Sequence, residues 1–79
     1  MKQIVFIART QAEAVEHMSR TTLPWLDEKV HIYAVGVCGS IHSTPDQVFM
    51  CGDINFNHRV WDWFTHQVLG AREIRWVLQ

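Results

Sequence analysis

Apolar residues occupy consecutive positions in three separate segments of the chain. The segments are Ile4–Ala8, Ile32–Val37 and Val48–Cys51. The side chains of a strand point alternately to its two faces, so a strand that is apolar at every position needs cover on both. The pattern therefore predicts three strands of a sheet that needs cover on both faces.

Two further segments have helical periodicity. Residues Thr10–Glu13 match the capping box, in which the threonine side chain accepts a hydrogen bond from the third helical amide. The helix that begins there ends near Arg20 or Thr21, and a second helix ends at Gly70. The predicted apolar stripes are Ala14, Val15 and Met18 in the first helix and Val60, Trp61, Phe64 and Val68 in the second.

The last segment, Arg72–Gln79, alternates between two kinds of position. Ile74, Trp76 and Leu78 occupy one set, and the other set includes the charged residues Glu73 and Arg75. A period of two predicts a strand, and its charges suit an exposed edge of the sheet.

The predicted order is strand, helix, strand, strand, helix, strand. The connector between the second and third strands, Cys38–Asp46, has nine residues, which is shorter than a typical parallel crossover. We therefore predict an antiparallel connection and an α+β two-layer sandwich, the ferredoxin-like split βαβ fold with a four-stranded sheet. The alternative is a small Rossmann-like α/β fold with a four-stranded parallel sheet, which the continuous apolar runs favour. A helical turn beginning at Thr44–Gln47 would make so short a crossover possible.

In the ferredoxin-like arrangement both helices cover one face of the sheet, so the other apolar face lacks cover. The residues expected on that face are Val5, Ile7, Tyr33, Val35, Val37, Phe49, Cys51 and Val77, or their alternates. Two copies that meet across a two-fold axis would bury such a face. We therefore expect a homodimer.

Composition and charge narrow the functional class. The 79 residues suffice for a single α/β domain over residues 1–79, and 48% hydrophobic against 19% charged residues is typical of a folded protein. Seven Lys and Arg balance eight Asp and Glu, so no strong field attracts nucleic acid or a membrane surface. The first apolar run is too short for a signal peptide or a membrane span, which indicates a cytosolic protein. Cys38 and Cys51 end apolar runs and are expected to be free thiols.

One face of the second helix carries side chains that could bind a metal ion. His58, Asp62 and His66 are spaced by four residues, and imidazole and carboxylate at that spacing can share a divalent ion. The same positions are also simply the solvent side of an amphipathic helix. Because an enclosing fourth ligand is lacking, the solvated-face interpretation is favoured.

A second candidate site consists of polar residues at the ends of the predicted strands. If the strands are parallel, these residues gather at one edge of the sheet, where α/β folds bind ligands. Walker and dinucleotide motifs are lacking, so we expect no cofactor, and we find no catalytic constellation. The candidate ligand-binding residues are Arg9, Ser40, His42, Asp53 and Asn55.

The tryptophans indicate a third kind of site. Helical spacing places Trp63 away from the buried stripe, beside Arg59 and Asp62, and Trp25 lies in an apolar connector. Partly exposed tryptophans are common at the centres of protein interfaces. We therefore predict a protein-interaction module, an adaptor, regulator or inhibitor of a larger assembly, similar in kind to small phage-encoded inhibitors. The alternative function is a small-ligand sensor or metal-dependent enzyme that uses the strand-end residues.

Overall fold

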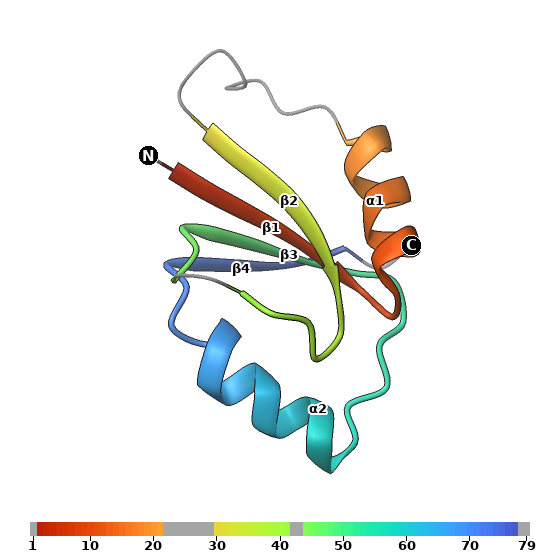
Figure 1. The fold of residues 1–79 in the computed structure, drawn as a ribbon, viewed down its shortest axis with the longest axis vertical. Helices are drawn as coiled ribbons and strands as arrows, with labels where there is room; N and C mark the ends of the chain where they lie inside the picture. Colours follow the sequence, from red (N-terminus) through yellow and green to blue (C-terminus); the bar gives the residue numbers. More distant parts are fainter. Residues whose placement is uncertain (1, 22–29, 42–43, 78–79) are drawn as a thin grey trace.

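The computed structural model describes residues 2–21, 30–41 and 44–77 of the chain. It contains four strands and two helical segments in the order βαββαβ (Figure 1). The strands are β1 (Lys2–Ala8), β2 (Val30–Gly36), β3 (Gln47–Cys51) and β4 (Glu73–Val77), and the helices are α1 (Gln11–Arg20) and α2 (His58–Trp63), which continues as the π-helix η1 (Phe64–Val68).

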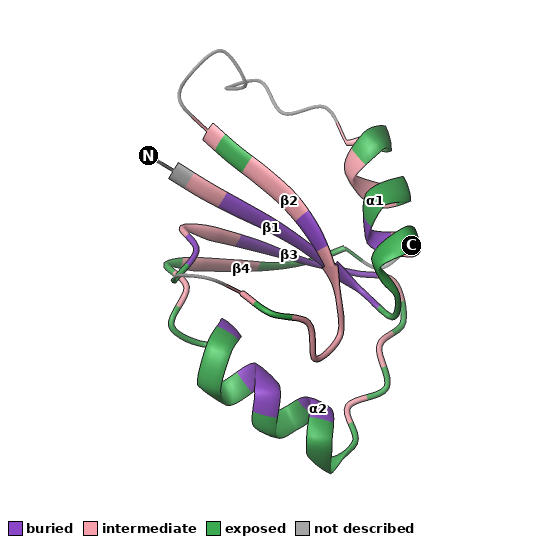
Figure 2. Cartoon of the chain, in the orientation of Figure 1, coloured by how far each residue is buried: buried purple, intermediate pink, exposed green. Residues whose placement is uncertain are grey.

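All strand pairs in the sheet are parallel, and the strand order is β2-β1-β3-β4. The ferredoxin-like prediction is therefore wrong. The fold is the Rossmann-like parallel arrangement, which explains why β1 and β3 are apolar at almost every position: each lies between two strands and is buried on both faces (Figure 2).

The crossover from β2 to β3 shows why the connector length was misleading. Gly36 pairs with Ala8, and Gln47 pairs with Ile4. The crossover therefore returns along four residues of β1, about 13 Å, and moves sideways by two strand spacings, about 10 Å. An extended segment the length of residues 37–46 reaches about 33 Å, so short strands permit a parallel crossover that needs no helix.

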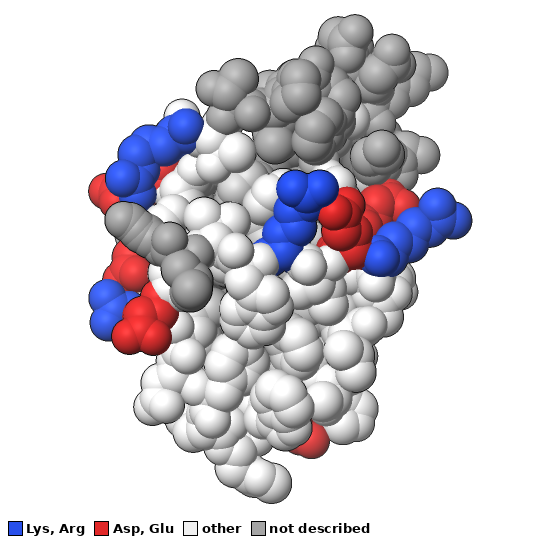
Figure 3. Space-filling model, turned by 180° about the vertical axis from the view of Figure 1, so that it is seen from behind, with Lys and Arg blue, Asp and Glu red and all other residues white. Residues whose placement is uncertain are grey.

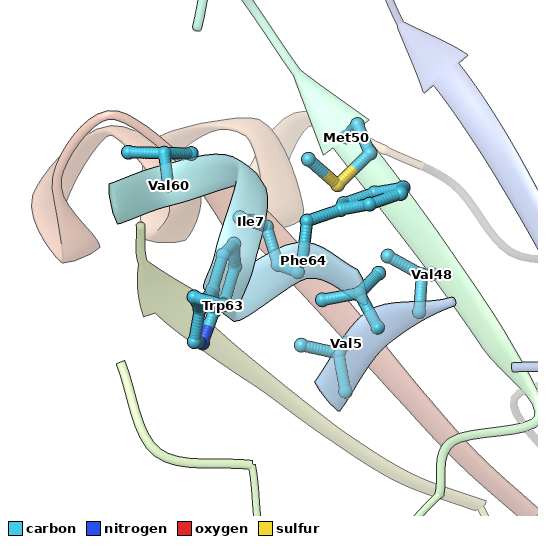
Figure 4. Packing of buried hydrophobic residues seen from close by; sticks show 8 residues of the cluster. Val5, Ile7, Val48, Met50, Val60, Trp63 and Phe64 are labelled. Atoms are coloured by element: carbon cyan, nitrogen blue, oxygen red, sulfur yellow. The ribbon is translucent and has the colours of Figure 1, made fainter. Parts of the chain in front are cut away.

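The two helices lie on opposite faces of the sheet. On one face α1 packs against β1 and β2, over a cluster that includes Ile4, Phe6 and Ala34. On the other face α2 and η1 pack over Val5 and Ile7, and the crossover joins them there through its apolar side chains (Figures 1 and 4). The wholly uncovered face on which the homodimer prediction rested does not exist.

The first helix follows its prediction closely. The side chain of Thr10 accepts a hydrogen bond from the amide of Glu13 at 3.2 Å, and the helix ends at Arg20. Ala14 is fully buried and Met18 packs on the core, whereas Val15 is 44% exposed. The buried stripe is therefore narrower than expected.

The start of β3 is fastened to two other strands through one residue. The amide of Asp46 donates to the carbonyl of Gln3, and an Asp46 carboxylate oxygen accepts from the amide of Gln3, both at 2.9 Å. The carbonyl of Asp46 accepts from the amide of Glu73 at 3.1 Å. Asp46 thus sets the register of β1, β3 and β4 at the amino end of the sheet.

Candidate functional site

The second helix supplies residues of the candidate site, and two local features position it. The Asn57 side chain accepts a hydrogen bond from the amide of Val60 at 2.9 Å, which caps α2. Farther along, the amide of Leu69 bonds the carbonyl of Phe64, five residues back, so the helix widens into the π-helix η1. The widening changes which side chains face the sheet.

The two tryptophans of α2 have the opposite exposure to the one predicted. Trp63 is buried at 8% exposure, and Trp61 is 54% exposed. In a regular α-helix Val68 would lie about 80° from Val60, on the same side as Trp61. A π turn rotates the chain less per residue, which brings Val68 back in line with Val60. The buried stripe is therefore centred between Trp63 and Phe64, and Trp61 lies outside it.

A tight turn after β2 receives the buried tryptophan. The indole nitrogen Nε1 of Trp63 donates to the carbonyl of Gly39 at 2.9 Å, which ties the helix to the crossover. A Cβ atom on Gly39 would lie only 2.9 Å from the carbonyl oxygen of Gly36, so the turn requires glycine there. Figure 4 shows Trp63 and Phe64 extending from the helix toward the sheet.

Four aromatic rings form the feature that we call the aromatic cluster: Phe56, Trp61, Phe64 and Trp76. Phe56 is at its centre, with ring centroids 5.6 Å from Trp61, 5.5 Å from Phe64 and 5.7 Å from Trp76. Trp61 also stacks on Phe64 at 5.6 Å with an interplanar angle of 11°. These separations are those of favourable aromatic pairs.

The cluster joins the buried core to the surface. Phe64 is 5% exposed and belongs to the core under α2, whereas Trp61 and Trp76 are 54% and 53% exposed. Together the two indoles leave on the order of 200 Å² of aromatic surface in water. Because both pack on rings fixed in the core or beside it, neither indole has much side-chain freedom left to lose.

Charge is unevenly distributed over the molecule. On the face that Figure 3 shows, the charged side chains gather across the upper part, and the lower part, at the level of α2, is almost free of them. An apolar aromatic surface is typical of the desolvated centre of a protein interface.

The predicted residues Arg59, Asp62 and Trp63 lie together, but on another side of α2. With Cys38, His66 and Gln67 they line an open hollow of about 370 Å³ between the helix and the crossover. Trp63 forms part of the wall of this hollow, and its indole is buried and hydrogen-bonded to the carbonyl of Gly39. It is therefore not exposed as a binding residue. Trp25, the other predicted contact residue, lies outside the described residues.

The structure brings only part of the candidate metal site together. Nδ1 of His66 is 3.5 Å from a carboxylate oxygen of Asp62 and 2.8 Å from the Asp62 carbonyl oxygen. Within residues 2–21, 30–41 and 44–77, no group of three or more His, Cys, Asp or Glu side chains is arranged to hold a metal ion. His58 therefore does not complete a set with these two residues.

The strand-end residues are distributed along the carboxyl edge of the sheet. Arg9 follows β1 and forms an exposed ion pair with Glu13 at 3.1 Å, while Asp53 and Asn55 follow β3 and are exposed. Ser40 lines a different hollow, beside Gln11 and Tyr33. His42 lies outside the described residues.

Both cysteines in the structure are free thiols, as predicted. Cys51 is buried at the end of β3, and burial raises the pKa of its thiol to about 11. A neutral, buried thiol is a poor nucleophile, so Cys51 has a packing role.

Comparison with protein-family models, with curated proteins and with solved structures gave no match. In the described part of the chain, neither helical segment has the length and apolar character needed to span a bilayer.

Proposed function

We propose that this protein is a cytosolic protein-interaction module, an adaptor, regulator or inhibitor of a larger assembly, that binds its partner through the aromatic cluster. The observation that carries the proposal is the pair of half-exposed tryptophans, Trp61 and Trp76, fixed on a buried ring. Tryptophan is enriched among the residues that contribute most to protein binding. The role predicted for Trp63 passes to Trp61, since Trp63 is buried.

The size of the cluster fits the centre of an interface. A stable interface covers roughly 800 Å² on each partner, and a few central side chains supply most of the affinity. The two indoles offer about a quarter of that area. The exposed residues Arg59 and Asp62 line the hollow on another side of α2 and lie outside the aromatic cluster.

The test compares proteins captured from a lysate of the source cells by wild type, Trp61→Ala, Trp76→Ala and Leu69→Ala. Leu69 is 57% exposed and lies outside the aromatic cluster, so it is the matched control for loss of an exposed apolar side chain. We expect a protein that wild type and Leu69→Ala retain and both tryptophan variants lose. The affinity for that protein, once purified, should fall at least tenfold in each tryptophan variant.

Two further measurements make this result decisive. Urea unfolding of each variant shows whether the domain is intact, and a folded Trp61→Ala that binds as tightly as wild type would refute the proposal. Equal loss in Leu69→Ala would also contradict it, since the contact would then not be specific to the cluster.

A small-ligand site is the second candidate, and the parallel sheet favours it. The strand order reverses direction between β1 and β3, and ligands of open α/β sheets bind beside the carboxyl ends of strands at such a point. Arg9 and Asp53 follow these two strands. Binding that Arg9→Ala and Asp53→Ala abolish, and that Trp61→Ala leaves unchanged, would favour this function over protein binding.

A further inference from the structure

The outer edge of β4 presents backbone groups in a defined pattern. The amide of Glu73 donates to Asp46, and the carbonyl of Val77 accepts from Gly52 at 2.9 Å, so these residues turn their backbone groups toward β3. Backbone groups alternate in direction along a strand. The backbone amides and carbonyls of Ile74 and Trp76 therefore point away from the sheet. Those of Arg72 would do the same if the strand continued by one residue toward its amino end.

Such an edge is a template for another strand. The sheet ends at β4 in the described part of the chain. Two copies related by a two-fold axis would pair this edge antiparallel, and outward-facing backbone groups must then meet outward-facing groups. This condition leaves only registers centred on a residue, and not those centred between two residues.

The charges of β4 distinguish among these registers. If the axis passes through Arg75, the two arginines face each other, and if it passes through Glu73, the two glutamates do so. If it passes through Trp76, Arg75 faces Val77. With the axis at Ile74, each Glu73 faces Arg75 of the second copy, so opposite charges meet twice. Opposite charges across a strand pair stabilise it, and like charges destabilise it.

We propose that two copies of this chain form a two-fold symmetric dimer in which β4 pairs antiparallel with β4, centred on Ile74. The pairing adds about six backbone hydrogen bonds and joins the two sheets into one. The homodimer expected from the sequence is thus assigned to the sheet edge and no longer to a sheet face.

The side chains fit this register on both faces. On the α2 face Ile74 packs against Ile74 of the second copy, and Trp76 faces Arg72 of the second copy, an arrangement that suits a cation–π contact. On the α1 face Glu73 and Arg75 already form an ion pair within the chain at 2.6 Å. The dimer joins two such pairs into a network of four charges.

This inference does not rest on the proposed function, because it uses the backbone edge and the charged face of β4. Its consequence for that function is geometric. The two aromatic clusters would lie on the same face of the joined sheet, so a dimer would present two docking surfaces side by side.

The test uses two charge reversals and their mixture. Glu73→Arg carries two positive charges on β4, and Arg75→Glu carries two negative ones. In the proposed register, two copies of the same variant place like charges opposite each other at positions 73 and 75. A dimer of one copy of each variant, which an equimolar mixture can form, restores both attractive pairs. Both variants lose the exposed ion pair between Glu73 and Arg75, which contributes little to folding. Glu73→Arg also loses the hydrogen bond that Glu73 accepts from the Gln47 side chain at 2.7 Å, so circular dichroism checks that each variant is folded.

Sedimentation of the full chain over a dilution series gives the readout. We expect wild type to dimerise, each single variant to dimerise more than about tenfold less tightly, and the mixture to recover the dimer. Wild type that stays monomeric up to its solubility limit would overturn the proposal. So would folded single variants that dimerise like wild type, or a mixture that remains monomeric while wild type is dimeric.

Trp61→Ala separates this result from the test of the proposed function. Trp61 lies on α2, away from the paired edge, so this variant should dimerise like wild type even where it loses the protein partner. Trp76 lies both in the aromatic cluster and on β4, so Trp61→Ala, and not Trp76→Ala, is the variant that distinguishes failure of the cluster from failure of the edge pairing.

Discussion

The two faces of the sheet differ in how their apolar cores end. On the α1 face the core closes on itself: Phe6 stacks on Phe49 with ring centroids 4.7 Å apart, and both are buried. On the α2 face the core continues outward through Phe64 to Trp61 and Trp76, which remain half in water. The first arrangement removes its aromatic rings from water, whereas the second leaves about half of each indole in contact with it.

Truncation of a buried side chain on the α1 face, where the core is closed, should reduce stability strongly. Phe6 is 1% exposed, so Phe6→Ala removes a buried ring from the centre of the sheet and should lower the free energy of unfolding by about 3–5 kcal/mol. Urea unfolding measures the change. Val15→Ala, at a half-exposed position on α1, is the control and should change stability by less than about 0.5 kcal/mol. Similar losses in both variants would contradict the idea of a closed core on this face.

The contribution of the α1 face to stability should also decrease at high pH, because Cys51 belongs to its core. The pKa of the Cys51 thiol is raised by burial to about 11, so its stabilising contribution is complete below the ordinary thiol pKa and is lost as the pH rises through 11. The loss amounts to roughly 2–3 kcal/mol. The free energy of unfolding, measured between pH 8 and about 11, should therefore fall more steeply with pH for wild type than for Cys51→Ala. Equal slopes would show that the thiol is not desolvated.

The smallest effect expected distinguishes the two tryptophans of α2. Trp63→Phe removes the hydrogen bond to the carbonyl of Gly39 and should cost about 1–3 kcal/mol. Trp61→Phe, on the exposed side of the helix, should cost less than about 0.5 kcal/mol. Thermal unfolding of the two variants side by side measures the difference. A reversed order would mean that the open face contributes more to folding than its exposure indicates.

Much of the fold could be predicted from the apolar pattern. Continuous apolar runs identified β1, β2 and β3, although β2 is an edge strand, and the capping box located the start of α1 at Thr10. Strand direction was mistaken because the rule for crossover length assumes longer strands than β3, which has five residues. With strands this short, ten extended residues suffice to return along β1.

The candidate site was harder to predict, for two physical reasons. Helical spacing assumes a constant rotation per residue, and the π-helix η1 (Phe64–Val68) breaks that assumption after the two tryptophans. A regular helix places Val68 on the side of Trp61, which is why Trp61 was assigned to the buried stripe. The contact between Trp76 and Phe56 depends on β4 lying beside β3, which local pattern does not reveal. The alternation of Ile74 and Trp76 did indicate their common face, and that was the available signal.

The strand order also governs how the chain acquires its structure. β1 leaves the ribosome first, yet it lies between β2 and β3 and can complete its pairing only after both have been synthesised. Every pair of neighbouring strands is parallel, so a hairpin between sequential strands cannot nucleate the sheet. Folding must close long loops before any strand pair gains stability, which slows it relative to helical domains of equal length. We therefore expect this protein of 79 residues to fold slowly for its size. During synthesis its apolar central strand β1 should stay exposed until β2 and β3 are available to pair with it.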